Sequence, residues 1–295
     1  MTEALARKRA ATLTPQRDTP DAADIRRIVD QCLAEDIGNG DLTAQLIDAA
    51  TICRARVVVR EAAVLCGTAW FNRVYERLDP KVTVHWEAVD GDRIMPGQLI
   101  CTINGPARSV NSGERMALNL LQTLSGTANI ARQYADAVAA TATVILDTRK
   151  TLPGLRSAQK YAVRCGGCAN HRMGLHDAML IKENHIAAAG GLRNAVTAAR
   201  AAHADAPLEL EVETLEQLDE ALALGVTMIM LDNFELDAIR TAVQRSRGKA
   251  QLEVSGGVAF EDLRELAATG VDFISVGALT KHLHAVDFSM RVEAH

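Results

Sequence analysis

Several common sequence features are absent from this chain of 295 residues. Aromatic side chains make up only 3% of it, and no ladder of basic and aromatic residues offers platforms on which bases would stack. No window approaches the roughly 18 uninterrupted apolar residues that a membrane helix requires. The first twenty residues carry charges but no apolar secretory core. These absences exclude nucleic-acid and membrane partners, and they predict a cytoplasmic protein.

Cysteine is present, but without the pattern of a disulfide framework. The six cysteines are scattered among apolar or strand-like segments, which indicates reduced and mostly buried thiols: Cys32, Cys53, Cys66, Cys101, Cys165 and Cys168. Cys165 and Cys168, followed by His171, have a spacing that zinc ligands also show. Because no second pair completes four-coordinate zinc, we do not favour a metal site there.

Composition and local pattern predict the organisation of the N-terminal part. Apolar residues make up 48% of the chain, enough to bury a full core in one large or two ordinary domains. Residues 1–18 are polar and lack periodicity, so we expect them to be extended or disordered. Thr19 then predicts the N-cap of a helix whose first residue is Pro20.

A small strand-rich domain is expected next. Residues 52–103 contain short alternating strands separated by Gly-containing turns. Ser112 predicts the start of a helix that breaks at Ser125–Gly126, and a second helical stretch runs to about Ala140.

Beyond residue 140, short apolar strands alternate with amphipathic helices. Successive strand ends recur after about 20 to 30 residues, which is the rhythm of a parallel (β/α) barrel. The predicted helices include Leu215–Leu224, Leu236–Arg245 and Phe260–Ala268. The predicted strands are Val144–Leu146, Met179–Lys182, Leu208–Glu213, Met228–Leu231, Leu252–Val254 and Phe273–Val276. The fold class is therefore predicted to be α/β.

Positive charge is concentrated between Asp147 and Lys182. This stretch has seven basic side chains against two acidic ones, whereas the whole chain has a net charge of -5. Its glycine, proline and asparagine residues favour a shaped loop over a solvated basic face. The segment therefore predicts an anionic ligand. The basic residues are Arg149, Lys150, Arg156, Lys160, Arg164, Arg172 and Lys182.

Residues with useful chemistry follow the predicted strands at the end where barrel active sites are built. Arg149 and Lys150 follow one strand, and Lys182 ends another. Arginine binds carboxylate or phosphate through two parallel bonds, whereas lysine acts as a point charge. Glu211 and Asp232, on neighbouring strands, would neutralise these cations, accept sugar hydroxyls or hold a magnesium ion.

Two glycine turns complete the predicted rim. Ser255-Gly256-Gly257 and Val276-Gly277-Ala278 each lie between a strand and a helix. Glycine allows backbone amides to approach an oxyanion closely, and the last two strand ends of a barrel often hold phosphate. We therefore expect a phosphate site there.

Six segments resemble the quinolinate phosphoribosyltransferase family. They are AEDIGNGDLTA at 34–44, GERMALNLLQTLSG at 113–126, DTRKTLPGLR at 147–156, KYAVRCGGCANHRMGLHDAMLIKENH at 160–185, LEVSGG at 252–257 and FISVGALTKH at 273–282. The resemblance covers nearly all of the chain from about residue 25. One departure is Cys168, which stands where the family pattern has glycine.

The resemblance implies a fold and an assembly. The fold is an N-terminal α/β sandwich domain, residues 19–129 with the C-terminal end 286–295, followed by an incomplete (β/α) barrel, residues 130–285. The assembly is a homodimer in which one subunit's sandwich domain covers the other's barrel mouth. The implied reaction joins quinolinate to 5-phosphoribosyl 1-pyrophosphate, with a magnesium ion, and releases pyrophosphate and carbon dioxide.

The resemblance also implies roles for individual residues. Catalytic roles fall on Lys150, Lys182, Glu211 and Asp232, of which the two acids hold the metal directly or indirectly. Arg115 would come from the partner subunit. The implied substrate-binding residues are Arg115, Thr148, Arg149, Lys150, His171, Arg172, Lys182, Glu211, Asp232, Ser255, Gly256, Gly257, Val276, Gly277 and Ala278.

Three rival interpretations predict different behaviour. A Schiff-base lyase centred on Lys182 would form an adduct that borohydride traps. A sensor of phosphoribosyl metabolites would bind ligand tightly without releasing carbon dioxide, but it would gain nothing from Glu211 and Asp232. A relative acting on nicotinate would need fewer cations, because its substrate has one carboxylate.

Overall fold

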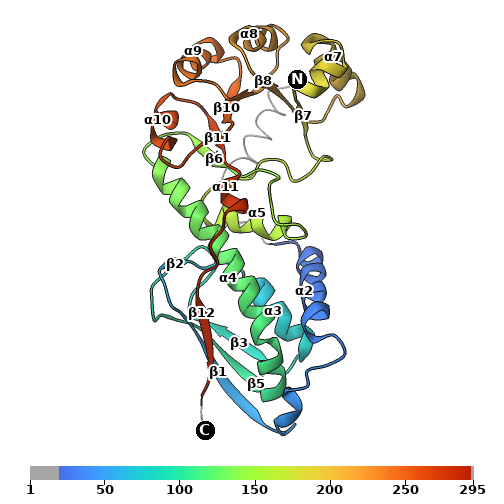
Figure 1. Ribbon diagram of the computed structural model, residues 1–295, viewed down its shortest axis with the longest axis vertical. Helices are drawn as coiled ribbons and strands as arrows, with labels where there is room; N and C mark the ends of the chain where they lie inside the picture. Colours follow the sequence, from blue (N-terminus) through green and yellow to red (C-terminus); the bar gives the residue numbers. More distant parts are fainter. Residues whose placement is uncertain (1–19, 294–295) are drawn as a thin grey trace. The chain divides into compact units, whose positions relative to one another are not determined.

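A computed structural model describes residues 20–293, which form two compact units. The sheet unit contains residues 20–132, 151–167 and 278–293, and the barrel unit contains Gln133–Lys150 and Cys168–Gly277. Residues 1–18, predicted to be extended or disordered, lie outside the described residues, as does Thr19. The domain boundaries at 129/130 and 285/286 stay a prediction. Figure 1 shows the elements of both units.

The sheet unit is built on a four-stranded antiparallel sheet with the order β12-β1-β5-β3. The chain's end returns to this sheet, because Val59 of β1 pairs with Phe288 of β12. The strands are β1 (Ile52–Val59), β2 (Ala63–Val64), β3 (Thr83–Trp86), β4 (Arg93–Ile94), β5 (Leu99–Pro106) and β12 (Phe288–Val292). The helical elements are α2 (Ala22–Ile37), η1 (Ala44–Leu46), α3 (Thr68–Leu78), α4 (Ala107–Val138), α5 (Arg156–Cys165) and α11 (Ala278–Lys281).

Two expected helix boundaries in this part are wrong. Helix α2 begins at Ala22 rather than Pro20, because the Asp21 side chain accepts a hydrogen bond from Ala23 N at 2.7 Å and caps the helix. Helix α4 begins at Ala107 and continues through Gly126 without a break. A side chain at Gly126 would overlap the backbone of His284, so glycine serves close packing there.

The barrel unit contains a six-stranded sheet with the order β6-β11-β10-β9-β8-β7. All its adjacent pairs are parallel, and helices α7, α8 and α9 pack against it (Figure 1). The strands are β6 (Val144–Leu146), β7 (Met179–Ile181), β8 (Leu208–Val212), β9 (Met228–Asp232), β10 (Gln251–Ser255) and β11 (Phe273–Ser275). The helices are α6 (Glu183–Ala188), α7 (Leu192–Ala202), α8 (Leu215–Ala223), α9 (Leu236–Ser246) and α10 (Leu263–Ala268).

The predicted α/β fold class is confirmed, and each of the six strands expected beyond residue 140 forms within one or two residues of its expected bounds. The strands are buried apolar runs, which parallel sheets covered by helices require. The Thr214 side chain accepts from Gln217 N at 3.2 Å and caps α8, so this helix begins where the sequence predicts. No helix among residues 20–293 is both long and apolar enough to cross a bilayer.

Candidate active site

Acidic side chains occupy the inward face of the barrel unit. Glu211 and Glu253 both lie opposite Met230 of the intervening strand, and alternate residues of a strand share one face. Glu209 therefore shares the face of Glu211, and Ser255 that of Glu253. Glu209 and Glu253 are 0% exposed. Burying an ionised carboxylate is costly. The two glutamates therefore indicate a functional site on this face of the sheet, because an apolar core would not need them.

A cavity of about 170 Å³ lies at the carboxyl end of these strands. It collects residues from the segments after β6 and β7, from the loop before β7, and from five strands of the sheet. Four cationic side chains line it together with two carboxyl groups. The lining residues are Thr148, Arg149, Lys150, His171, Arg172, Leu180, Lys182, Glu211, Met230, Glu253, Ser255 and Ser275.

Lys182 and Glu211 form an ion pair in the cavity wall. The Lys182 Nζ lies 2.5 Å from Glu211 Oε2, and the side chains are 43% and 5% exposed. Burial raises the pKa of the Glu211 carboxyl, Lys182 opposes this rise, and the charge of Asp232 adds to it. Glu211 therefore lies close enough to Asp232 for the two acids to repel each other.

His171 lies against the two buried glutamates. Its Nε2 is 3.0 Å from Glu209 Oε2 and 3.6 Å from Glu253 Oε2. Its Nδ1 accepts a hydrogen bond of 2.7 Å from the Arg172 backbone N–H. Burial raises the pKa of Glu253 to about 8, repulsion from Glu209 adds to the rise, and His171 and Ser275 reduce it. These surroundings therefore favour the protonated form of Glu253.

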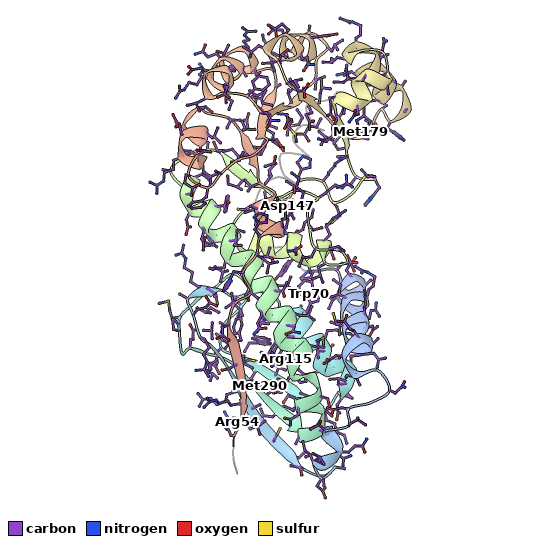
Figure 2. All side chains as sticks on the ribbon, in the orientation of Figure 1. Arg54, Trp70, Arg115, Asp147, Met179 and Met290 are labelled. Carbon is purple, nitrogen blue, oxygen red and sulfur yellow. The ribbon has the colours of Figure 1, made fainter. Side chains whose placement is uncertain are left out.

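Asp147 anchors the loop that carries His171. This carboxylate follows β6, is 0% exposed, and is labelled in Figure 2. Its Oδ1 accepts from the His171 backbone N–H at 2.9 Å, and its Oδ2 accepts from Asn170 Nδ2 at 2.7 Å. The guanidinium of Arg172 donates to the carbonyl oxygen of Ala178 at 3.0 Å. These bonds hold Arg172 at the cavity.

Glycine is required for different structural reasons in the two glycine turns. Gly256 has φ of +95°, and a side chain there would overlap Asn233, whose backbone N–H donates to Ser255 O at 3.1 Å. A Cβ at Gly277 would lie 2.9 Å from Lys150 Cδ. Both turns therefore permit a close approach that any side chain would block.

Not every predicted site residue lines the cavity. Asp232 pairs in register with Ser255, and its charge adds to the rise in the pKa of Glu211, but it is not part of the lining. Gly256, Gly257, Val276 and Gly277 are in the barrel unit but outside that lining. Ala278 and Arg115 belong to the sheet unit, where Arg115 is an exposed residue of α4 (Figure 2).

The cationic segment is divided by the fold. Arg149, Lys150, Arg172 and Lys182 line the cavity, whereas α5 carries the other three cations into the sheet unit: Arg156, Lys160 and Arg164. The Arg164 guanidinium lies 5.7 Å from the ring centroid of Tyr161. The four cations that line the cavity are therefore the ones expected to bind an anion.

The described residues contain two clusters with metal-ligand chemistry, Cys66–Asp90–Cys165 and His171–Glu209–Glu253. Neither combines Cys165, Cys168 and His171. All six cysteines are free thiols.

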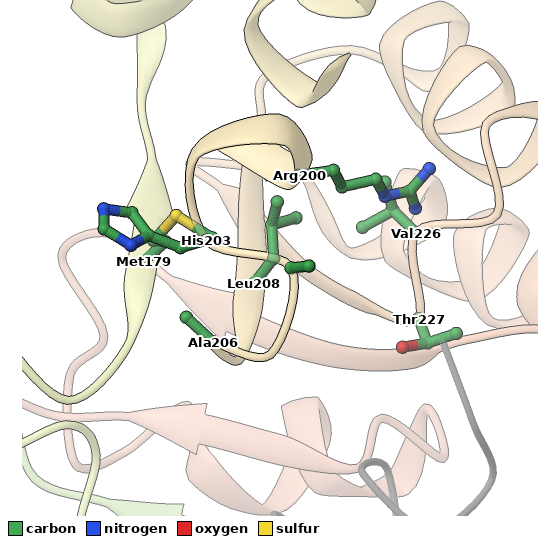
Figure 3. A pocket seen from close by; sticks show the side chains of 8 residues that line it. Met179, Arg200, His203, Ala206, Leu208, Val226 and Thr227 are labelled. Atoms are coloured by element: carbon green, nitrogen blue, oxygen red, sulfur yellow. The ribbon is translucent and has the colours of Figure 1, made fainter. Parts of the chain in front are cut away.

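Other cavities of the barrel unit have less suitable linings. One of about 390 Å³ is lined mainly by alanine and other apolar side chains around α7. Another, of about 230 Å³, contains Arg200 and His203 near the amino-terminal ends of β7 and β8 (Figure 3). Arg200 donates to the carbonyl oxygens of Leu224 and Gly225 at 2.8 and 3.0 Å, so its guanidinium stabilises the end of α8.

Sequence reasoning missed Glu209, Glu253 and Ser275. Each is a polar residue inside an apolar strand, and such a residue is ordinarily assigned to the solvent face. The signal for Glu209 was the spacing of two residues from Glu211, which places both carboxylates on one face. Glu253 had no comparable signal.

Comparisons with known proteins cover nearly the whole chain. Residues 41–125 and 127–291 match the families described as the N-terminal and C-terminal domains of quinolinate phosphoribosyl transferase. The chain is 41% identical over 269 residues to a probable nicotinate-nucleotide pyrophosphorylase [carboxylating] of Bacillus subtilis, covering 91% of this chain and 93% of that protein. It is 42% identical over 272 residues to the Mycobacterium leprae nicotinate-nucleotide pyrophosphorylase [carboxylating], with 90% and 96% covered.

A solved structure gives the same assignment. The nicotinate-nucleotide pyrophosphorylase from Francisella tularensis superposes with a TM-score of 0.91 at 44% identity, covering 94% of this chain and 99% of that one. The two families matched, the identity to curated relatives and the shared fold agree with the cationic cavity of the barrel unit. This chain belongs to the quinolinate phosphoribosyltransferase family.

Proposed function

We propose that this chain converts quinolinate and 5-phosphoribosyl 1-pyrophosphate to nicotinate mononucleotide, pyrophosphate and carbon dioxide, as a step of NAD biosynthesis. The observation that carries the proposal is the single cavity in which Arg149, Arg172 and Lys182 meet Glu211. Two anionic substrates need several cationic side chains to bind them. The positive charge that develops on the ribose carbon during the reaction needs a nearby carboxylate. The relatives that share this fold bear the corresponding names.

Arg149 and Arg172 would hold the two carboxylates of quinolinate. A guanidinium binds a carboxylate through two parallel N–H···O bonds, each a charge-assisted contact of roughly 1.5 to 3 kcal/mol. Lys182 lies across the same cavity and supplies a third positive charge. This number of cations favours a pyridine with two carboxylates over nicotinate, which has one.

The phosphoribosyl group would bind beside the glycine turns. Ser255 lines the cavity, and the backbone beyond it at Gly256 and Gly257 can approach an oxyanion without hindrance from side chains. Lys150 runs along Gly277 and would meet the pyrophosphate side. These turns therefore support a site for the 5-phosphate.

Magnesium fits the two acids at the end of β8 and β9. Carboxylate oxygens suit this hard cation, and the charge of Asp232 adds to the rise in the pKa of Glu211 that burial causes. A dication held there would relieve the repulsion between the two acids. When bound, it would neutralise charge on the departing pyrophosphate.

The chemistry follows from the placement of charge. As pyrophosphate leaves, positive charge grows on the anomeric carbon, which the Glu211 carboxylate stabilises while Lys150 stabilises the leaving group. The pyridine nitrogen then bonds to that carbon. The quaternised nitrogen stabilises the electron pair left on the ring when the adjacent carboxylate departs as carbon dioxide. Because no covalent intermediate with the protein forms, positioning two substrates together supplies much of the rate.

The proposal also includes a homodimer in which Arg115 completes the partner's site. Arg115 is exposed on α4, and its positive charge suits an anionic ligand. Mixing Arg115→Ala with Lys182→Ala tests this assembly, because each inactive variant would supply the residue that the other lacks. Recovery of activity on mixing supports the trans arrangement, and no recovery after subunit exchange contradicts it.

The decisive experiment measures carbon dioxide released from carboxyl-labelled quinolinate. We expect release only when phosphoribosyl pyrophosphate and magnesium are both present. Binding of both substrates without release would instead favour a sensor. A covalent adduct trapped by borohydride on Lys182 would favour a Schiff-base lyase. The predicted cytoplasmic location is tested separately, by cell fractionation.

A further inference from the structure

The proposed reaction contains a proton transfer that the cationic residues do not explain. When carbon dioxide leaves the ring, the electron pair remains on carbon, and that carbon must gain a proton. Lys182 is held in an ion pair with Glu211 at 2.5 Å. The Nδ1 of His171 accepts the Arg172 N–H, so a neutral His171 has its ring proton on Nε2, facing Glu209 and Glu253. The donor must therefore be sought elsewhere in the cavity.

Glu253 has the position that the donor requires. It lines the same cavity as Arg149, Arg172 and Lys182, which would hold the ring carboxylates. It lies on the inward face of β10, two residues before Ser255, which shares that face. A carboxyl group in this lining can therefore meet the ring that those cations would orient.

The surroundings of Glu253 favour its acid form. The charged and polar groups that face it are Glu209 on β8, His171 in the loop before β7 and Ser275 on β11. Glu209 and Glu253 are both 0% exposed and lie against the same His171 nitrogen. Two buried carboxyl groups in contact cannot both ionise at low cost, so the pair retains a proton at neutral pH.

We propose that Glu253 is the general acid that protonates the pyridine ring after decarboxylation. This inference rests on the proposed function. The Glu253 O–H bond breaks, its proton forms the new C–H bond with the electron pair left by carbon dioxide, and the carboxylate keeps the O–H electrons. Glu253 regains a proton from water when the product leaves. Glu209 is a positioning residue, because it acts by keeping the proton on Glu253.

The test separates ribosyl transfer from decarboxylation in a single turnover. Transfer releases pyrophosphate and needs no proton, whereas formation of nicotinate mononucleotide needs one. In Glu253→Gln, which keeps the size of the side chain, we expect pyrophosphate release within about threefold of wild type. Nicotinate mononucleotide should form roughly 100-fold more slowly, the usual loss when a general acid is removed. Without a proton donor, the electron pair on the ring carbon recaptures carbon dioxide, so the ribosylated dicarboxylate should accumulate.

A matched variant and a wild-type measurement guard against misfolding. Glu253→Asp keeps an acid and should recover part of the second step. In wild type, formation of nicotinate mononucleotide should decline as pH rises through about 8, the pKa of Glu253, while pyrophosphate release does not. Glu209→Gln removes the neighbouring charge and should move that decline to lower pH.

The possible outcomes distinguish a catalytic role of Glu253 from a structural one. Equal slowing of both steps in Glu253→Gln would make Glu253 structural and overturn the inference, as would no slowing of either. A wild-type decline shared by both steps would overturn it as well. If wild type releases no pyrophosphate from quinolinate and phosphoribosyl pyrophosphate, the proposed function fails and this inference falls with it.

Discussion

Replacing Asp147 should test whether this buried carboxylate holds the loop that carries His171 and Arg172 at the active site. This carboxylate does not line the cavity, yet it accepts hydrogen bonds from His171 N–H at 2.9 Å and from Asn170 Nδ2 at 2.7 Å. Asp147→Ala removes both acceptors and leaves two donors in a region closed to solvent. Asp147→Asn keeps the shape, and its amide oxygen still accepts from His171 N–H.

The magnitude follows from these two bonds. A hydrogen bond to a charged group contributes roughly 1.5 to 3 kcal/mol, so the loss of two in Asp147→Ala should lower the free energy of unfolding by about 3 to 6 kcal/mol. In Asp147→Asn the Asn170 amide can rotate and present its oxygen to the new NH₂ group. Two neutral bonds of about 1 kcal/mol each then replace the charged ones, so the loss should be about 2 kcal/mol smaller than in Asp147→Ala.

Urea unfolding and steady-state kinetics measure the two consequences. Because Arg172 follows His171 directly, release of this loop should raise KM for quinolinate about tenfold, with a smaller change for phosphoribosyl pyrophosphate. Asp237→Ala is the matched control in the same unit. Its carboxylate is 93% exposed and pairs with Arg240 on α9, so its loss should change stability by less than about 0.5 kcal/mol.

This reasoning would be refuted if the two Asp147 variants lost the same free energy of unfolding. If alanine and asparagine lower stability by the same amount, the hydrogen bonds are not the cause. If both variants leave KM for quinolinate unchanged, the loop does not position Arg172.

Three further predictions follow from other contacts. Gly256→Ala should cost about 2 to 3 kcal/mol in thermal unfolding and raise KM for phosphoribosyl pyrophosphate, because φ is +95° and the new Cβ overlaps Asn233; an unchanged KM would contradict a phosphate site there. Lys182→Met should raise the pKa of Glu211 further, so the acid limb of kcat/KM should move to higher pH; an unmoved limb would contradict a role for ionised Glu211. Burial raises the pKa of Asp90 above its ordinary 3.8, so the folded state favours the protonated acid and stability is lost as pH rises through the folded pKa. Urea midpoints of Asp90→Asn should lack this loss, and an identical pH dependence would refute it.

Much of the barrel unit is predictable because its local and tertiary preferences agree. The strands from Val144–Leu146 to Phe273–Ser275 are short apolar runs separated by helices, and burial on both faces selects that pattern. Glu211 and Asp232 were identifiable because they end such runs. The break expected at Gly126 failed because close packing against His284, a residue 158 positions later, decides the need for glycine there.

The amino-acid sequence alone determined the α/β class, the strands, the family and the cations expected to bind an anion, since each depends on residue type and spacing. Only the tertiary structure decided that Arg149, Arg172 and Lys182 share a cavity whose lining includes none of the α5 cations. It also decided that Glu209 and Glu253 face inward against His171. The physical reason is that sheet register and loop closure bring together groups distant along the chain, and no local preference specifies which of them meet.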